Sequence, residues 1–359
     1  MEDSSYPIDS SLQRLLAVKN VTHGDLLEIR ELLRGGSVID WSRLHFRSIP
    51  AVNEFLRVFM CDPDNVRDME RIQQIHRAAT DYLATTLEIS IPSVLAHPHR
   101  IQNLFLYASS PGKHRTKACT LLKVMFVLNH LEARQLLFNL PISERELFSR
   151  VEKRVKKTVM RMVELGFAVE EYVASQKTKE SLVTKVLSKR EGTAAQVFDR
   201  IRFRIIVSHK KQLLPVLFHL KRHLFPFPCV IPGESSNNID PFQDLVREAF
   251  GLQVEGSEAM PASIRSNEFS HRDYKVIHFI ADIPVRVQDI IEQSNLMMLS
   301  RFGNTVFVPT EFQVFDTASH FLNEAGPAAH SHYKGRQVRE VISRLYAGTE
   351  DEGGEDQSD

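Results

Sequence analysis

The stretch VFDRIRFRIIV at residues 197–207 decides the fold class. Its last five residues, from Phe203 to Val207, are mainly apolar and have the length and composition of a buried strand, and Asp199 precedes them by four positions. A helical pattern follows over 211–225, and two further strands are predicted at about 275–285 and 305–316. A strand, a helix and two more strands with flanking helices predict an α/β domain built on a mixed sheet.

The connections within this domain differ in character. Residues 228–262 are rich in turn-forming residues and predict a long excursion with at most one short helix. A helical insert is expected at 288–300 and a final helix at about 336–346. The last segment, 349–359, has six acidic residues and no basic residue, so we expect it to be disordered.

The first part of the chain is helical in pattern. Apolar residues recur with helical spacing at about 26–33, 51–60, 66–88 and 115–139. The run Ser143-Glu144-Arg145-Glu146 then matches a capping box, which predicts a helix that begins near Pro141 and ends near Gly166. We therefore expect a helical N-terminal domain of unknown role at 1–140, an α/β domain at 141–347 and an acidic tail at 348–359.

Composition and charge exclude several classes of protein. The chain has 359 residues, 43% hydrophobic and 25% charged, which is typical of a globular protein of about two domains. Lys+Arg and Asp+Glu each number 45, so no strongly basic nucleic-acid-binding coat is expected, although local patches remain open. Three widely spaced cysteines are typical of a reducing cytosol. No signal peptide or apolar run of ~18 residues is present, so we expect a cytoplasmic protein with no membrane partner.

A basic segment follows the capping-box helix. Residues 150–190 contain 11 Lys/Arg against 5 Asp/Glu. Lys177, Ser181 and Lys185 are spaced four residues apart, which predicts that they share one helical face, with Lys189 continuing the spacing. Two ammonium groups with a hydroxyl between them suit a polyphosphate. The alternative is an ordinary solvated basic face.

The strand that follows Asp199 alternates arginine with apolar residues. A carboxylate before a buried strand is a common position for a ligand of a hard cation. Arg200, Arg202 and Arg204 would share the strand face opposite Asp199. The alternative is an Asp–Arg ion pair at the edge of a sheet.

Two later strands carry further polar candidates. Tyr274 and His278 share one strand face, where an aromatic ring can stack on a base and a histidine can bind phosphate or orient a carboxylate; both could also be ordinary half-buried sheet residues. Glu311 and Gln313 alternate with Phe312 and Val314. Because a carboxylate in an apolar strand is costly without a cation or hydrogen-bond partners, Glu311 is a candidate functional residue.

The order of these segments resembles the synthetase domain of the RelA/SpoT-type alarmone enzymes. That family has a K-x3-S-x3-K helix, a D-x4-R strand, a G-Y-Q-S-x-H strand, an E-x-Q strand and the run A-E-x-G-x-A-A-H-x-x-Y-K. The matching residues here are Lys177/Ser181/Lys185, Asp199/Arg204, Tyr274/His278, Glu311/Gln313 and the run from Glu324 to Lys334. The resemblance covers about residues 145–340. It implies that the mixed-sheet domain is nucleotidyltransferase-like and follows the helical N-terminal domain that the residue pattern predicts.

The resemblance also implies an activity. The family transfers pyrophosphate from ATP to the 3′-hydroxyl of GDP or GTP, the chemistry of guanosine tetraphosphate metabolism and the stringent response. By analogy, Asp199 and Glu311 would share one Mg²⁺, and Glu311 would take the proton from the hydroxyl. Lysines 177, 185 and 189 would hold the triphosphate, Tyr274 would stack on the acceptor base, and His278 would position Glu311 or an acceptor phosphate. Ser181, Arg204 and Gln313 complete the nucleotide-binding set.

The sequence departs from the family mainly around the acceptor. Asp273, Lys275 and Val276 replace the family's Gly, Gln and Ser around Tyr274, and Phe315 stands where an arginine follows the E-x-Q motif. Three interpretations therefore stay open: an active guanosine-nucleotide pyrophosphokinase, a domain that binds nucleotide without catalysis, and pyrophosphoryl transfer to another acceptor such as an RNA end. The N-terminal residues lack the family's His-Asp hydrolase dipeptide, and the oligomeric state is left open.

Overall fold

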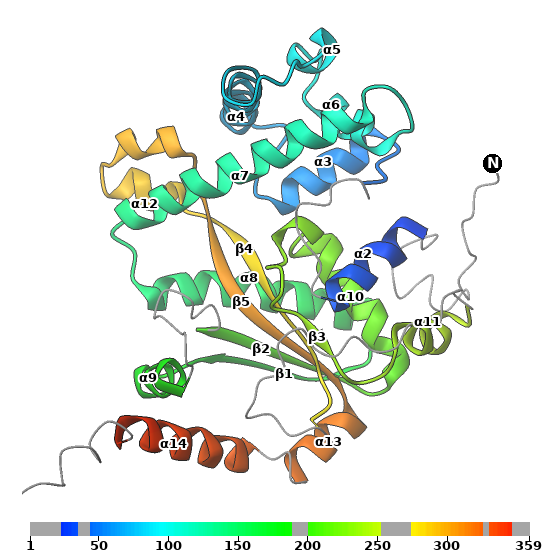
Figure 1. Ribbon diagram of the computed structural model, residues 1–359, viewed down its shortest axis with the longest axis vertical. Helices are drawn as coiled ribbons and strands as arrows, with labels where there is room; N and C mark the ends of the chain where they lie inside the picture. The colour runs from blue at the N-terminus through cyan, green and yellow to red at the C-terminus, as the bar shows by residue number, and fades with distance from the viewer. Residues whose placement is uncertain (1–22, 35–43, 189–199, 253–273, 326–329, 347–359) are drawn as a thin grey trace, which may run out of the picture.

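The computed structural model describes residues 23–34, 44–188, 200–252, 274–325 and 330–346 (Figure 1). Its centre is a five-stranded mixed sheet in the order β1-β2-β5-β4-β3. The strands are β1 (Val169–Gln176), β2 (Ile201–Val207), β3 (Ser236–Asn237), β4 (Ile277–Arg286) and β5 (Thr305–Asp316). Only β2 and β5 pair in parallel, and the other pairs are antiparallel. The predicted α/β fold with a mixed sheet is confirmed.

Helices surround this sheet and continue beyond it at one end (Figure 1). They are α2 (His23–Leu33), α3 (Ile49–Val58), α4 (Val66–Thr85), α5 (Ser93–Ala96), α6 (Gln102–Ser109), α7 (Arg115–Asn139), α8 (Glu144–Glu164), α9 (Lys179–Ser188), α10 (Leu213–His223), α11 (Phe242–Phe250), α12 (Gln288–Gln293), α13 (Thr317–Ala325) and α14 (His330–Tyr346). Short 3-10 turns are η3 (Lys210–Gln212), η4 (Phe227–Cys229) and η5 (Met297–Phe302). None of the helices within the described ranges is long and apolar enough to cross a membrane.

Most sequence predictions of single elements hold. The capping box starts α8, where the Ser143 hydroxyl accepts a hydrogen bond from the Glu146 amide at 3.1 Å. The helix predicted at 288–300 is instead α12 followed by η5, because Asn295 adopts a left-handed conformation with φ of 57° between them. Strand β1 was not predicted. Most of its residues are exposed, so it lacks the apolar run that marks the inner strands.

The buried residues form two large hydrophobic clusters. One lies within α3, α4, α6 and the first half of α7, and includes Leu83, Leu104 and Leu121. The other fills the space between the sheet and α2, α8, α10 and α11. Leu26 to Leu33 of α2 and the end of α7 belong to this second cluster, so residue 140 does not separate the two clusters.

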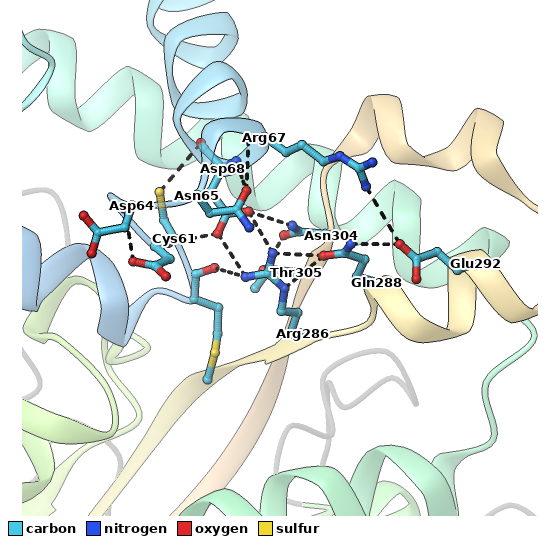
Figure 2. Close-up of polar contacts among 12 residues, drawn as sticks. Cys61, Asp64, Asn65, Arg67, Asp68, Arg286, Gln288, Glu292, Asn304 and Thr305 are labelled. Carbon is cyan, nitrogen blue, oxygen red and sulfur yellow. Dashed lines mark hydrogen bonds and ion pairs between the residues drawn. The ribbon is translucent and has the colours of Figure 1, made fainter.

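A buried polar network joins the helical cluster to the far end of the sheet (Figure 2). Asp68, near the start of α4, is 3% exposed and accepts hydrogen bonds at 2.9 Å from both terminal nitrogens of Arg286. It also accepts from the Asn304 side chain and the Asp62 amide, each at 2.9 Å. Burial would raise the pKa of Asp68, but these hydrogen bonds outweigh it and lower the pKa below its usual value. The network ties α4 to the end of β4.

The half-buried carboxylate of Asp282, on β4, has far fewer partners. Burial raises the pKa of Asp282 to about 7. Its Oδ2 lies 3.8 Å from Nε2 of His130 on α7, and the His130 ring stacks on Phe307 with centroids 3.8 Å apart. Burial lowers the pKa of His130 to about 4. As the pH rises through about 7, Asp282 therefore takes on a charge whose cost no strong cationic contact in the described region offsets.

Replacing Asp282 by asparagine should stabilise the protein mainly at high pH. A raised pKa in the folded state contributes stability that is fully present below the unfolded pKa of about 3.9 and is lost as the pH rises through about 7. The neutral asparagine avoids that loss, so Asp282→Asn should gain roughly 2–4 kcal/mol at pH 8 and about 1 kcal/mol at pH 4.5. His130 titrates with the opposite sign, so the difference between variant and wild type is the quantity to measure, by thermal unfolding at both pH values. A gain that is the same at both would contradict this account.

Candidate active site

Two rows of polar side chains lie on the sheet face opposite the main core. The parallel register of β2 with β5 and the antiparallel register of β5 with β4 set these rows across three strands. The first row is Arg202–Glu311, with the apolar Ile280 as its β4 member, and the second is Arg204–Gln313–His278. The intervening residues Phe203, Phe312 and Val314 point into the core cluster, as the alternation in the sequence predicts.

Glu311 is at the centre of the first row and is 2% exposed. Its Oε2 lies 2.9 Å from Nε of Arg202 and 3.7 Å from Nζ of Lys177. Its Oε1 accepts a hydrogen bond from the Gln313 amide at 2.7 Å and lies 3.3 Å from Nε2 of His278. Burial alone would raise the pKa of Glu311, but Arg202, His278 and Lys177 outweigh burial and hold the pKa well below its usual range.

Arg204 holds the Gln313 side chain of the second row in place. Its Nε donates to Oε1 of Gln313 at 3.0 Å, which orients the Gln313 amide nitrogen toward Glu311. A terminal nitrogen of Arg204 lies 3.8 Å from Oε1 of Glu324, whose side chain is 52% exposed. The predicted residues His278, Arg204 and Gln313 therefore form one network with Glu311.

Lys177 reaches this network from outside the predicted helix. Helix α9 begins only at Lys179, after the Thr178 hydroxyl accepts a hydrogen bond from the Ser181 amide. The prediction that Lys177 shares a helical face with Ser181 and Lys185 is therefore wrong. Lys177 directly follows β1, and its amide bonds to the Arg200 carbonyl at 2.9 Å, which keeps it beside β2.

Ser181 and Lys185 lie on α9, and α9 packs along α14 (Figure 1). The two helices are joined near their ends, where Ser188 contacts the side chains of Gln337 and Arg344. Both predicted residues are half-buried. Their part in nucleotide binding stays a prediction.

A third row on the same sheet face is apolar. Ile206, Phe315 and Val276 form a small separate cluster, and the Tyr274 ring packs edge-on against Phe315 with centroids 6.3 Å apart. Burial raises the pKa of the Tyr274 phenol, and the nearby charges of Arg204 and Arg202 partly offset this rise. Tyr274 thus lies between the polar rows and an apolar patch that Phe315 completes.

Two predicted residues, Asp199 and Lys189, lie outside the described residues. One residue of the network, Arg202, was not among the candidates. The signal was present, since Arg202 stands two positions before Arg204 in the same alternating strand. The sequence could not supply the parallel register that sets Arg202 directly opposite Glu311.

The described residues do not fit a Mg²⁺ site at Glu311. Mg²⁺ prefers carboxylate, carbonyl and water oxygens, whereas the groups around Glu311 are a guanidinium, an ammonium, an imidazole and an amide N–H donor. Within the described ranges, no group of three His, Cys, Asp or Glu side chains could hold a metal ion. The predicted partner ligand is Asp199, so the shared Mg²⁺ remains a prediction based on the resemblance.

Comparison with known proteins gives matches among solved structures only. No protein-family model and no curated protein matches the sequence. The small alarmone synthetase 2 from Bacillus subtilis matches with 15% identity and a TM-score of 0.32, over 61% of this chain and 97% of that chain. The small alarmone synthetase 1 from the same organism, bound to its product pppGpp, matches with 15% identity and a TM-score of 0.30, over 57% and 87%.

A third match is a GTP pyrophosphokinase family protein from Streptococcus pneumoniae, with 12% identity and a TM-score of 0.32, over 58% of this chain and 87% of that chain. The matches are thus to the RelA/SpoT-type family whose motifs the sequence resembles, and the chain diverges strongly from them. At these TM-scores the likeness decides nothing about the chemistry of the site, which has to be argued from the described residues.

Proposed function

We propose that this chain is a nucleotide pyrophosphokinase that transfers pyrophosphate from ATP to the 3′-hydroxyl of a guanosine nucleotide. The observation that supports the proposal is the buried carboxylate of Glu311, held among Lys177, Arg202 and His278 on one face of the sheet. Cationic donors gathered on one surface suit a polyphosphate, and a carboxylate among them is placed to accept a proton.

In this reaction the 3′-oxygen of the acceptor forms a bond to the β-phosphorus of ATP. The bond from that phosphorus to the oxygen that bridges it to the α-phosphorus breaks, and AMP leaves with the electron pair. The hydroxyl proton passes to Glu311. Lys177 binds phosphate oxygens, and Arg204 holds Gln313 against Glu311. Catalysis by these residues is positioning and electrostatic stabilisation, as in phosphoryl transfer generally.

A second candidate is nucleotide binding without transfer. It is favoured by the low pKa of Glu311, which makes this carboxylate a weak base while its donors stay in place. The apolar packing of Tyr274 on Phe315 also supports it, because the acceptor side of the sheet face is partly filled by protein.

The test is to incubate the protein with Mg-ATP and, separately, GDP, GTP and a short RNA, and to separate the products by anion-exchange chromatography. The proposal predicts AMP in equal amount with a 3′-pyrophosphorylated guanosine nucleotide. A modified RNA without a guanosine product would favour the alternative acceptor. Nucleotide binding with no AMP from any acceptor would favour the binding module.

Tyr274 should act on the acceptor and not on ATP. If its ring stacks on the acceptor base, Tyr274→Ala should weaken acceptor binding by about 1–3 kcal/mol, whereas Tyr274→Phe should change it little. ATP binding should be nearly unchanged, because Lys177 follows β1 whereas Tyr274 precedes β4. Calorimetric titration of each nucleotide, with thermal unfolding of the same samples, checks this. Equal losses for both nucleotides with a lowered melting temperature would show that Tyr274 is only a packing residue.

A further inference from the structure

We propose that Arg202 takes the place that a divalent cation would have at Glu311, and that it binds a phosphate of the nucleotide directly, with no metal ion needed at this carboxylate. The inference rests on the proposed function, because it concerns how the same sheet face recognises a polyphosphate. It makes Arg202 a binding residue of the site.

The first argument is the occupancy of the Glu311 carboxylate. A carboxylate has about four lone-pair sites, and four donors contact this one: Arg202 and Lys177 at Oε2, and His278 and Gln313 at Oε1. A metal ion would have to displace at least one donor. It would also lie beside two cationic side chains that repel it at short range.

The second argument is that the backbone fixes Arg202 in this position. Arg202 is the Cα partner of Glu311 across the parallel β2–β5 pair and of Ser175 across the β1–β2 pair. The backbone of Arg202 is therefore held between two paired strands, and the Arg202 side chain is only 17% exposed. A guanidinium carries five N–H donors, so it can contact Glu311 through Nε and also bind a phosphate oxygen.

The third argument is the balance of charge on this face. Among the described residues of the polar network, Lys177, Arg202 and Arg204 are cationic, and they face the carboxylates of Glu311 and Glu324. Glu324 is 52% exposed, so solvent largely screens its charge. Three cationic side chains near one buried carboxylate favour an anion over a divalent cation.

This arrangement couples binding to chemistry. A polyphosphate competes with Glu311 for Arg202 and Lys177. As these cations move toward the phosphates, less positive charge stabilises the Glu311 carboxylate, and Glu311 becomes a better proton acceptor. Substrate binding would then produce the base that the transfer needs.

The test is calorimetric titration with the non-transferable analogue α,β-methylene-ATP, at one ionic strength, in EDTA and in Mg²⁺. The variants are Arg202→Gln and the charge-balanced double variant Arg202→Gln/Glu311→Gln, which removes Arg202 together with its carboxylate partner if the single variant fails to fold. The matched control is Arg200→Gln, two positions earlier, whose guanidinium pairs with Glu144 away from the site.

We expect wild type to bind in EDTA within about tenfold of its affinity in Mg²⁺, and both Arg202 variants to bind in EDTA about 10- to 100-fold more weakly, with Arg200→Gln unchanged. Equal affinities of wild type and the Arg202 variants in EDTA would overturn the inference. Binding that requires Mg²⁺ and ignores Arg202 would do the same, while leaving the proposed function intact. No binding in either buffer would overturn the proposed function itself.

Discussion

Glu311→Gln is expected to abolish pyrophosphoryl transfer and also to destabilise the fold. Glutamine cannot accept the hydroxyl proton, and it removes the negative charge that faces Arg202 and Lys177. Removing one partner of a buried ion pair costs about 3–5 kcal/mol. If Glu311 instead belonged to an empty metal site with two carboxylates, Glu311→Gln would stabilise the fold, because loss of one carboxylate would relieve repulsion. The measurements are AMP release under single-turnover conditions and urea unfolding at pH 7.

The destabilisation caused by Glu311→Gln should depend on pH. The pKa of Glu311 in the folded state is depressed, so its stabilising contribution is present above the unfolded pKa of about 4.3 and is lost as the pH falls through the lower, folded pKa. The cost of Glu311→Gln should therefore shrink in acid. Glu164→Gln, on an exposed ion pair with Arg161, is the control and should cost about 0.5 kcal/mol or less. An unchanged or raised stability of Glu311→Gln at pH 7 would contradict the described network.

Asp68→Ala should cause the second large loss, and this loss concerns stability alone. The change leaves the Arg286 guanidinium, the Asn304 amide and the Asp62 N–H without their common acceptor (Figure 2). We expect a cost of about 3–5 kcal/mol, the range for breaking a buried charge pair. Urea unfolding at pH 7 measures it.

The matched control for Asp68 is Asp64→Ala. Asp64 lies four positions earlier, is 81% exposed and pairs only weakly with the surface residue Arg57. Its loss should cost less than about 1 kcal/mol. Equal costs for the two variants would show that the network between α4 and the end of β4 contributes little to the free energy of unfolding.

Local patterns in the sequence predict the elements that bury one face. The alternation of Glu311 and Gln313 with Phe312 and Val314 correctly predicts which side chains enter the core, since successive residues of a strand point to opposite faces. The hydroxyl of Ser143 likewise caps α8 as predicted. These patterns need only neighbours along the chain.

Contacts between residues far apart in the sequence, and exposed edge strands, cannot be predicted from such local patterns. Arg202 and Glu311 are 109 positions apart, and Asp68 and Arg286 are 218 positions apart, so no local spacing relates them. Strand β1 is an exposed edge strand, and it moves Lys177 off the helix and next to β2. The network around Glu311 could therefore be predicted as a set of residue types, but its direct contact with Arg202 could not.

A crystal structure of the protein with α,β-methylene-ATP tests the central claim most directly, because the claim is that this sheet face holds the polyphosphate. The account predicts phosphate oxygens within hydrogen-bonding distance of Arg202 and Lys177, with Glu311 facing the β-phosphorus. A nucleotide bound elsewhere on the molecule, with no phosphate oxygen near Arg202, would contradict it.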